Sequence, residues 1–301
     1  MIKQIVRPIY KGVHSLLFNT IDANPMFVKK ENGKEVKKGH ISLEHLNDPR
    51  LDDKLVSNLK AAGISVNAHN IKIEEYHTYL WKANYPETYY GGGLDPNQNF
   101  TEKSLEHYVS TEFIDFKPDT VFIDVAACTS PFYTIVRELY GCKTTYQQDL
   151  IFDKGLKGDK IGGYGHEIPL EDESVNAVTL HCSLEHFEND SDTAFFVEME
   201  RVLKKGGRLV VLPFYIAYEF TNHVDPIYNL LKSHPIKVDK RARLRYCSWF
   251  QFFSRHYDVQ ALQERILSKV PNLQLSVYRV NNFRDVHEKS YLRFVGVFEK
   301  T

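Results

Sequence analysis

Histidines, carboxylates and small residues gather directly after the strands that the sequence predicts. Asp124 lies in one such segment, Asp149 ends a second and His166 lies in a third. A fourth segment carries His181 and His186. Imidazole and carboxylate groups often transfer protons, and carboxylates also accept hydrogen bonds from ligand hydroxyl and ammonium groups. The four segments therefore combine proton-transfer chemistry with ligand binding.

Alternating strands and helices position these segments. Buried parallel strands are predicted by apolar, β-branched runs at 121–125, 143–146, 177–180 and 208–212. Helices are predicted between them, which makes the sheet parallel and doubly wound. Ligands of such sheets bind beyond the carboxyl ends of the strands. We therefore expect the four segments to converge on one crevice.

The ends of the chain are predicted differently. Runs at 275–280 and 292–298 are joined by a connection too short for a helical crossover, which predicts an antiparallel pair. Ahead of residue 118, helices are predicted at 5–18, 52–62, 73–83 and 101–113. Three consecutive glycines end the segment 85–93, which predicts a flexible flap with tyrosine contacts.

The order of four motifs resembles a known family. The motifs are Val121–Ser130, Ile168–Val178, Leu184–His186 and Arg201–Gly207. Together they resemble the class I S-adenosylmethionine-dependent methyltransferases, in their small-molecule branch known as type 11. The resemblance covers residues 118–215 well. It implies an α/β fold with a doubly wound, mostly parallel, seven-stranded sheet, and S-adenosylmethionine as the cofactor.

The resemblance implies a role for the loop after the first strand. Asp124 would take the ammonium group of the methionine part of the cofactor. Ala126, Cys128 and Ser130 stand where the family often has glycine. Their small side chains still permit close approach, but positive φ angles become costly. We therefore expect this loop to follow a different path. The alternative role for Asp124 is to cap the loop.

The ribose and adenine contacts are also implied by the resemblance. Asp149 would accept both ribose hydroxyls, with Gln148 as the rival position. Tyr164 stands where the family often has an acid, and would contact the adenine unless it packs on the sheet instead. The other expected cofactor contacts are Tyr90, Gly165, His166 and His181. The helix that contains Glu102 and His107 would form a lid, or these two residues would lie on an ordinary helix surface.

Methyl transfer depends mainly on positioning, with a base added if the acceptor is an alcohol. The candidate bases are His181, His186, His223 and Asp225. Arg243 and Arg245 would share one face of a strand and bind a phosphate or carboxylate of the acceptor, or protect a solvated edge strand. Tyr215 and other aromatic side chains nearby favour a sugar or glycan acceptor.

Length and composition set further limits. The chain has 301 residues and a formal charge of −1, which argues against a non-specific nucleic-acid partner. It shows no apolar run of bilayer-spanning length and no signal-peptide pattern, so we expect a cytoplasmic protein. The four cysteines lack zinc spacing, so no metal is expected. We predict an N-terminal appendage and helical cap over residues 1–117, then a methyltransferase domain over 118–301 with an acceptor-binding insertion at 214–260.

These observations predict an O-methyltransferase that acts on a small molecule, with sugars or glycans as the favoured acceptors. The alternative is a non-catalytic relative that serves as a binding or scaffold protein, because the cofactor loop lacks glycines. A nucleotide-binding oxidoreductase is disfavoured because no GxGxxG motif follows the first strand. The acceptor and the oligomeric state stay open.

Overall fold

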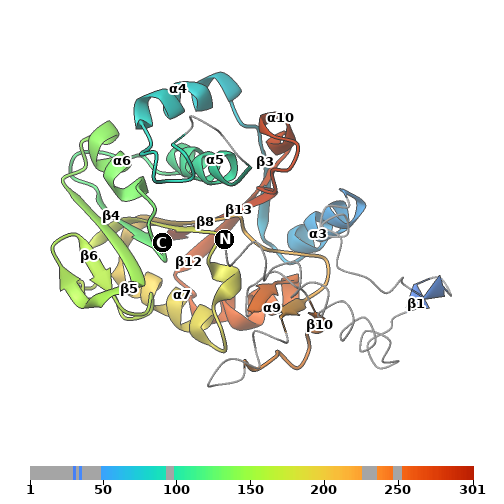
Figure 1. Cartoon of the computed structure of the whole chain (residues 1–301). Helices are drawn as coiled ribbons and strands as arrows, with labels where there is room; N and C mark the ends of the chain where they lie inside the picture. The colour runs from blue at the N-terminus through green and yellow to red at the C-terminus, as the bar shows by residue number, and fades with distance from the viewer. Residues whose placement is uncertain (1–29, 32–33, 36–48, 93–97, 226–235, 247–252) are drawn as a thin grey trace. The chain divides into compact units, whose positions relative to one another are not determined.

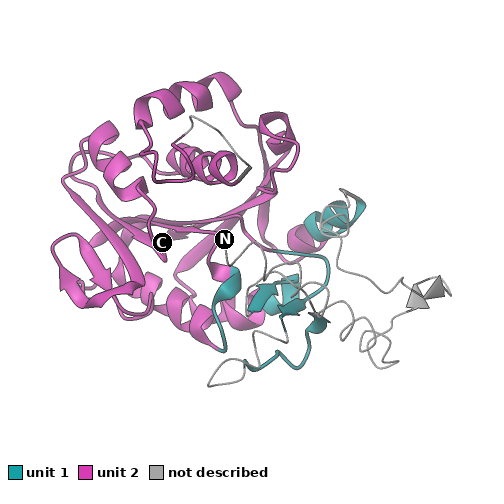
Figure 2. Cartoon of the chain, in the orientation of Figure 1, with its two compact units in different colours: residues 1–57, 185–189, 216–261 teal, residues 58–184, 190–215, 262–301 magenta. Residues whose placement is uncertain are grey.

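The computed structural model describes residues 30–31, 34–35, 49–92, 98–225, 236–246 and 253–301. The chain divides into two compact units, shown in Figure 2. Unit 1 consists of residues 1–57, 185–189 and 216–261, and unit 2 of residues 58–184, 190–215 and 262–301. Residues 58–117, predicted as part of an appendage and cap, thus fall in the same unit as the residues that follow them. The helix predicted at 5–18 lies outside the described residues.

Unit 2 is built on one large sheet (Figure 1). Its strands, in spatial order, are β3 (Ser65–His69), β12 (Leu273–Val280), β13 (Phe294–Lys300), β8 (Leu203–Leu212), β7 (Val175–His181), β4 (Val121–Val125), β5 (Thr144–Lys157) and β6 (Lys160–Gly162). Only β13 runs antiparallel to its neighbours. The predicted doubly wound, mostly parallel sheet is confirmed, as is the antiparallel pair near the C-terminus.

The predicted number of strands is wrong: the described sheet has eight, not seven. Two of the eight strands have no predicted run: β6, at one edge, and β3, which pairs with β12 in parallel at the other edge. None of the five side chains of β3 is fully buried. Short, half-exposed edge strands lack the apolar run by which a buried strand is predicted, so the sequence pattern missed it.

Helices cover both faces of this sheet. Those with described bounds are α4 (Ile73–Ala83), α5 (Gln98–Phe113), α6 (Phe132–Tyr140), α7 (Ser191–Val202), α10 (Phe283–Val286) and the single turns η1 (Leu184–His186) and η2 (Leu267–Lys269). In Figure 1, α4, α5 and α6 lie on one side of the sheet and α7 on the other. Aromatic residues such as Tyr76, Tyr108 and Phe132 fill the core on the α5 side. No described helix is long and apolar enough to cross a membrane.

Unit 1 contains a smaller sheet in the order β10 (Arg243–Tyr246), β9 (Thr221–Val224), β11 (Phe253–His256). Strand β10 is parallel to β9 and β11 is antiparallel to it. The short pair β1 (Lys30–Glu31) and β2 (Lys34–Glu35) also belongs to this unit. Helices α3 (Pro49–Ala61) and α9 (Val259–Arg265) each contain a boundary between the units.

Candidate active site

Asp124 lies in β4 and is fully buried. Its Oδ1 accepts hydrogen bonds from the Thr179 hydroxyl at 2.9 Å and from Nδ1 of His181 at 3.1 Å. Among the described residues, none pairs with its other oxygen, Oδ2. An unsatisfied buried polar atom costs about 1 to 3 kcal/mol, more when it is charged. Oδ2 is therefore an acceptor that a positively charged ligand group could satisfy.

The loop after β4 keeps a left-handed backbone without glycine. The φ angles of Ala126 and Cys128 are 51° and 50°, so both residues adopt positive φ despite its cost. Hydrogen bonds from the next strand hold the loop: the Ala126 N–H donates to Gln148 Oε1 at 3.1 Å, and the Cys128 N–H donates to Asp149 Oδ2 at 2.7 Å. These hydrogen bonds offset the cost of the left-handed backbone conformation, which is about 1 to 2 kcal/mol for each residue other than glycine.

This strain can be measured. We expect Cys128→Gly to stabilise the protein by about 0.5 to 1 kcal/mol, because the left-handed strain exceeds the entropic cost of glycine. Ala127, whose φ is not positive, provides the matched control, and Ala127→Gly should destabilise the protein. Urea unfolding gives both values. Equal destabilisation by the two changes would contradict the assignment of strain to Cys128.

In the neighbouring strand β5, where its pairing with β4 ends, Gln148 and Asp149 make different contacts. Gln148 is buried, and its amide donates to the Gly163 carbonyl at 2.5 Å while its oxygen holds Ala126. Asp149 is half-buried, and its two oxygens accept the N–H groups of Cys128 and Ile151. Carboxylate oxygens have capacity for further donors. The arrangement favours Asp149 over Gln148 as a ligand contact.

The third predicted segment presents an exposed aromatic ring. Tyr164 is 53% exposed and stacks on His166 with ring centroids 5.1 Å apart. It is therefore not packed against the sheet. A Cβ atom at Gly165 would come within 3.2 Å of Val125 Cγ1 and 3.3 Å of Phe195 Cδ2, so this position favours glycine. Tyr90 is also exposed, whereas Tyr85 and Tyr89 of the predicted flap are buried.

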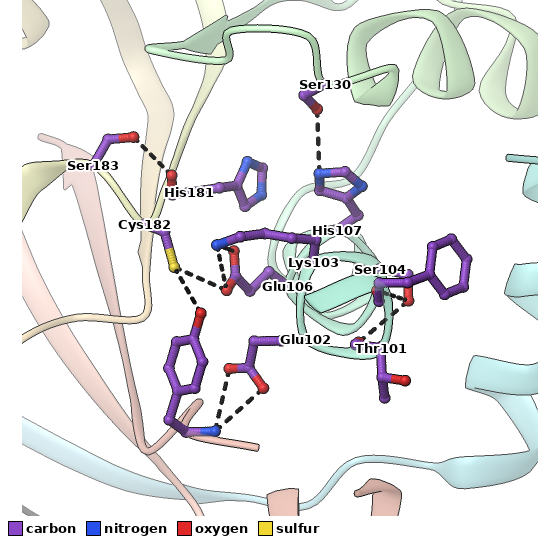
Figure 3. Close-up of polar contacts among 12 residues, drawn as sticks. Thr101, Glu102, Lys103, Ser104, Glu106, His107, Ser130, His181, Cys182 and Ser183 are labelled. Carbon is purple, nitrogen blue, oxygen red and sulfur yellow. Dashed lines mark hydrogen bonds and ion pairs between the residues drawn. The ribbon is translucent and has the colours of Figure 1, made fainter. Parts of the chain in front are cut away.

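Helix α5 presents a buried polar face that the sequence did not reveal (Figure 3). Spacing of three and four residues places its members on one side of the helix. These members are Glu102, Lys103, Glu106, His107 and Ser110, all but Lys103 at most 1% exposed. Glu102 and His107 are thus not on an ordinary helix surface. The helix predicted as a lid packs into the core of unit 2.

Glu106 lies behind a thiol at the carboxyl end of β7. The Cys182 thiol donates to Glu106 Oε1 at 3.0 Å, and Lys103 Nζ lies 3.2 Å from the same oxygen. Cys182 is partly exposed and has a φ of 44°, an uncommon backbone conformation for its residue type. The Tyr291 hydroxyl lies 3.6 Å from its sulfur. A carboxylate, an ammonium group and a thiol therefore meet beside the strand end that carries His181.

The second carboxyl group of this face has a different charge state. Burial, followed by the negative charge of Glu106, raises the pKa of Glu102 to about 8. Its oxygens accept the Tyr291 N–H at 3.2 and 3.3 Å. At neutral pH Glu102 is mostly protonated. The ion pair of Glu106 with Lys103 then carries the charges of this cluster.

The other candidate bases belong to unit 1. His223 and Asp225 are fully buried, and His186 Nδ1 lies 2.7 Å from the Phe253 carbonyl. Burial lowers the pKa of His223 well below its usual range, with smaller contributions from His256 and Arg245. His223 is therefore uncharged at neutral pH.

The predicted substrate arginines share one carboxylate. Nη1 of Arg243 lies 2.7 Å and Nη2 of Arg245 3.6 Å from Glu219 Oε2. β10 is an edge strand of the described small sheet. Tyr215 is half-buried in unit 2. Among the described residues, no group of three or more His, Cys, Asp and Glu side chains is placed to hold a metal ion.

Comparisons with known proteins give one family match. Residues 123–211 match the family model described as a methyltransferase domain. No curated protein sequence matches the chain.

Among solved structures, the chain is similar to PH0226 from Pyrococcus horikoshii OT3, with 15% identity over 72% of this chain and 100% of that one, at a TM-score of 0.43. It is similar to an S-adenosylmethionine-dependent methyltransferase from Mesorhizobium loti, with 13% identity over 64% and 96%, at a TM-score of 0.42. It is also similar to the 1,6-didemethyltoxoflavin-N1-methyltransferase of Burkholderia thailandensis, with 12% identity over 79% of this chain and 94% of that one, at a TM-score of 0.42.

Proposed function

We propose that this chain, whose residues 123–211 match the methyltransferase domain model, transfers the methyl group of S-adenosylmethionine to an oxygen atom of a small molecule. The observation that carries the proposal is the buried, unsatisfied Oδ2 of Asp124 at the switch point between β4 and β7. The ammonium group of S-adenosylmethionine is a donor that would satisfy it. Bound S-adenosylmethionine supplies a methyl group already activated on a sulfonium.

The residues around Asp124 fit the rest of this cofactor. The left-handed loop at Ala126 and Cys128 leaves only small side chains next to the ligand. Asp149 offers carboxylate oxygens for ribose hydroxyls, and Tyr164 offers an exposed ring for adenine. A scaffold protein without catalytic function would not need this strained loop. The loop geometry therefore favours the enzyme over the non-catalytic alternative.

The acceptor would be an uncharged hydroxyl compound, such as a sugar or glycan. Hydroxyl groups lose a proton on methylation, and Glu106 behind Cys182 provides a base. Arg243 and Arg245 are already paired with Glu219, which makes them poor binders of an acceptor phosphate. We therefore favour neutral acceptors over phosphorylated ones. Screening sugars and other hydroxyl compounds with labelled S-adenosylmethionine tests this class.

Calorimetric titration tests the cofactor assignment. We expect S-adenosylmethionine and S-adenosylhomocysteine to bind, and NAD not to bind. Absence of binding at millimolar cofactor would refute the enzyme proposal, whereas NAD binding would favour an oxidoreductase.

Asp124→Asn is expected to weaken S-adenosylmethionine binding about 30-fold, because the amide keeps the shape of the carboxylate but loses its charge. The same titration measures the effect. Asp153→Asn provides the control, since Asp153 is exposed and pairs with Lys157 at 2.8 Å. Unchanged affinity in Asp124→Asn would exclude this carboxylate as the ammonium site.

A further inference from the structure

Helix α5 is linked through His181 to the carboxylate that is proposed to bind the cofactor. Ser110 Oγ lies 2.9 Å from His181 Nε2, and His181 Nδ1 lies 3.1 Å from Asp124 Oδ1. We propose that Ser110 is a positioning residue: through His181 it fixes the Asp124 carboxylate so that Oδ2 stays available to the ammonium group of the ligand. The inference rests on the proposed function and names a residue that acts on its cofactor site.

For a neutral His181 ring, the hydrogen bonds fit one arrangement of protons. An ionised carboxylate only accepts hydrogen bonds, so Nδ1 of His181 must carry the hydrogen of its bond to Asp124. In the neutral ring Nε2 is then an acceptor, and the Ser110 hydroxyl donates to it. In this arrangement Ser110 donates a hydrogen bond to His181, and His181 donates one to Asp124.

The packing around His181 prevents the ring from adopting another orientation. The His107 ring lies 4.9 Å from it at 72°, and the Phe132 ring lies 5.2 Å away at 89°. Ser110 is fully buried, and the side chain of His181 is 8% exposed. Burial also lowers the pKa of His107 well below its usual range, so this neighbour is uncharged at neutral pH.

Loss of the serine hydroxyl would disturb Asp124 in a defined way. Without a donor at Nε2, the ring can carry its proton there instead, which places the Nδ1 lone pair against Asp124 Oδ1. The Thr179 hydroxyl alone would then hold that oxygen. The carboxylate would turn to relieve the repulsion, and Oδ2 would move from its fixed position.

Two ligands separate this role from general structural support. S-adenosylhomocysteine contains the ammonium group, and 5′-methylthioadenosine lacks the amino-acid part. We expect Ser110→Ala to weaken S-adenosylhomocysteine binding about tenfold and to leave 5′-methylthioadenosine binding unchanged, as measured by calorimetric titration. Ser110→Thr, which keeps the hydroxyl, should restore the affinity.

Ser104→Ala is the matched control, because Ser104 is a fully buried serine on the same helix that bonds to Tyr76 instead. It should leave both affinities unchanged. The inference is overturned if Ser110→Ala leaves S-adenosylhomocysteine binding unchanged or weakens both ligands equally. If the wild-type protein binds neither ligand, the proposed function itself fails.

The position of the ring proton of His181 can be measured spectroscopically in the wild-type protein, so this test does not depend on the folding of a variant. Long-range ¹H–¹⁵N NMR distinguishes the two neutral forms of a histidine ring. We expect His181 to carry its proton on Nδ1 in the wild type and to populate both forms in Ser110→Ala. A proton on Nε2 in the wild type would overturn the inference.

Discussion

Replacing Glu106 by glutamine is expected to lower kcat by about 10² to 10⁴, the usual contribution of a general base. The affinity for S-adenosylmethionine should not change, because Glu106 makes no contact with Asp124 or with the loop after β4. The glutamine keeps the shape of the side chain, yet it cannot accept a proton. Labelled methyl transfer to an acceptor found by screening gives kcat, and calorimetry gives the affinity.

Glu106 is favoured as the base because the other nearby groups are committed elsewhere. Both ring nitrogens of His181 are hydrogen-bonded, and Glu102 is mostly protonated at neutral pH. Glu106 bonds to Cys182, which is partly exposed. An acceptor proton can pass to the Cys182 sulfur while the thiol proton passes to Glu106. The carboxylate gains one proton and the acceptor oxygen becomes an anion.

Two further variants test this proton path. Cys182→Ala should also lower kcat, because it removes the group between Glu106 and the acceptor. Glu112→Gln, on the same helix but paired with His69 at 3.0 Å, should leave kcat unchanged. Glu106→Gln removes the ion pair with Lys103 and so reduces the stability of the variant. Rates are therefore compared well below its melting temperature. Equal kcat in Glu106→Gln and the wild type would exclude Glu106 as the base.

The sheet was predictable from the sequence because its central strands are apolar runs. β4, most of β7 and the last four residues of β8 are buried on both faces, which produces the continuous apolar segments that mark parallel strands. The predicted strands at 121–125 and 143–146, with the segments that follow them, also led to Asp124, Asp149 and Tyr164 as site candidates. Strand ends are fixed once the strands are known.

The polar face of α5 was not predictable in this way. Periodicity assigns apolar residues to the core and polar residues to solvent, so the alternative to a lid for Glu102 and His107 was an ordinary helix surface, and Glu106 and Ser110 gave no signal of burial. They are buried because Tyr291 and Cys182 donate hydrogen bonds to the two carboxyl groups and the Ser110 hydroxyl bonds to His181. These partners are distant in sequence, and only the folded chain brings them to α5. Departures from local pattern of this kind concentrate at functional sites.

Glu102→Gln is expected to change how stability depends on pH. The pKa of Glu102 is about 8 in the folded protein, against a usual value of 4.5. The folded state therefore holds a proton that the unfolded state releases as pH rises above 4.5. The stability from this proton is present in full below the unfolded pKa and is lost as pH rises to the folded pKa of about 8. Above that value both states are ionised and the contribution no longer changes.

The glutamine is neutral at every pH and can still accept the Tyr291 N–H, so the variant should lack this loss. Relative to the wild type, we expect Glu102→Gln to gain about 3 kcal/mol in free energy of unfolding between about pH 5 and pH 8. Urea unfolding across that range measures the gain. Glu75→Gln is the control, because Glu75 is 60% exposed and pairs with Lys72 at the surface. Parallel curves for Glu102→Gln and the wild type would contradict the raised pKa.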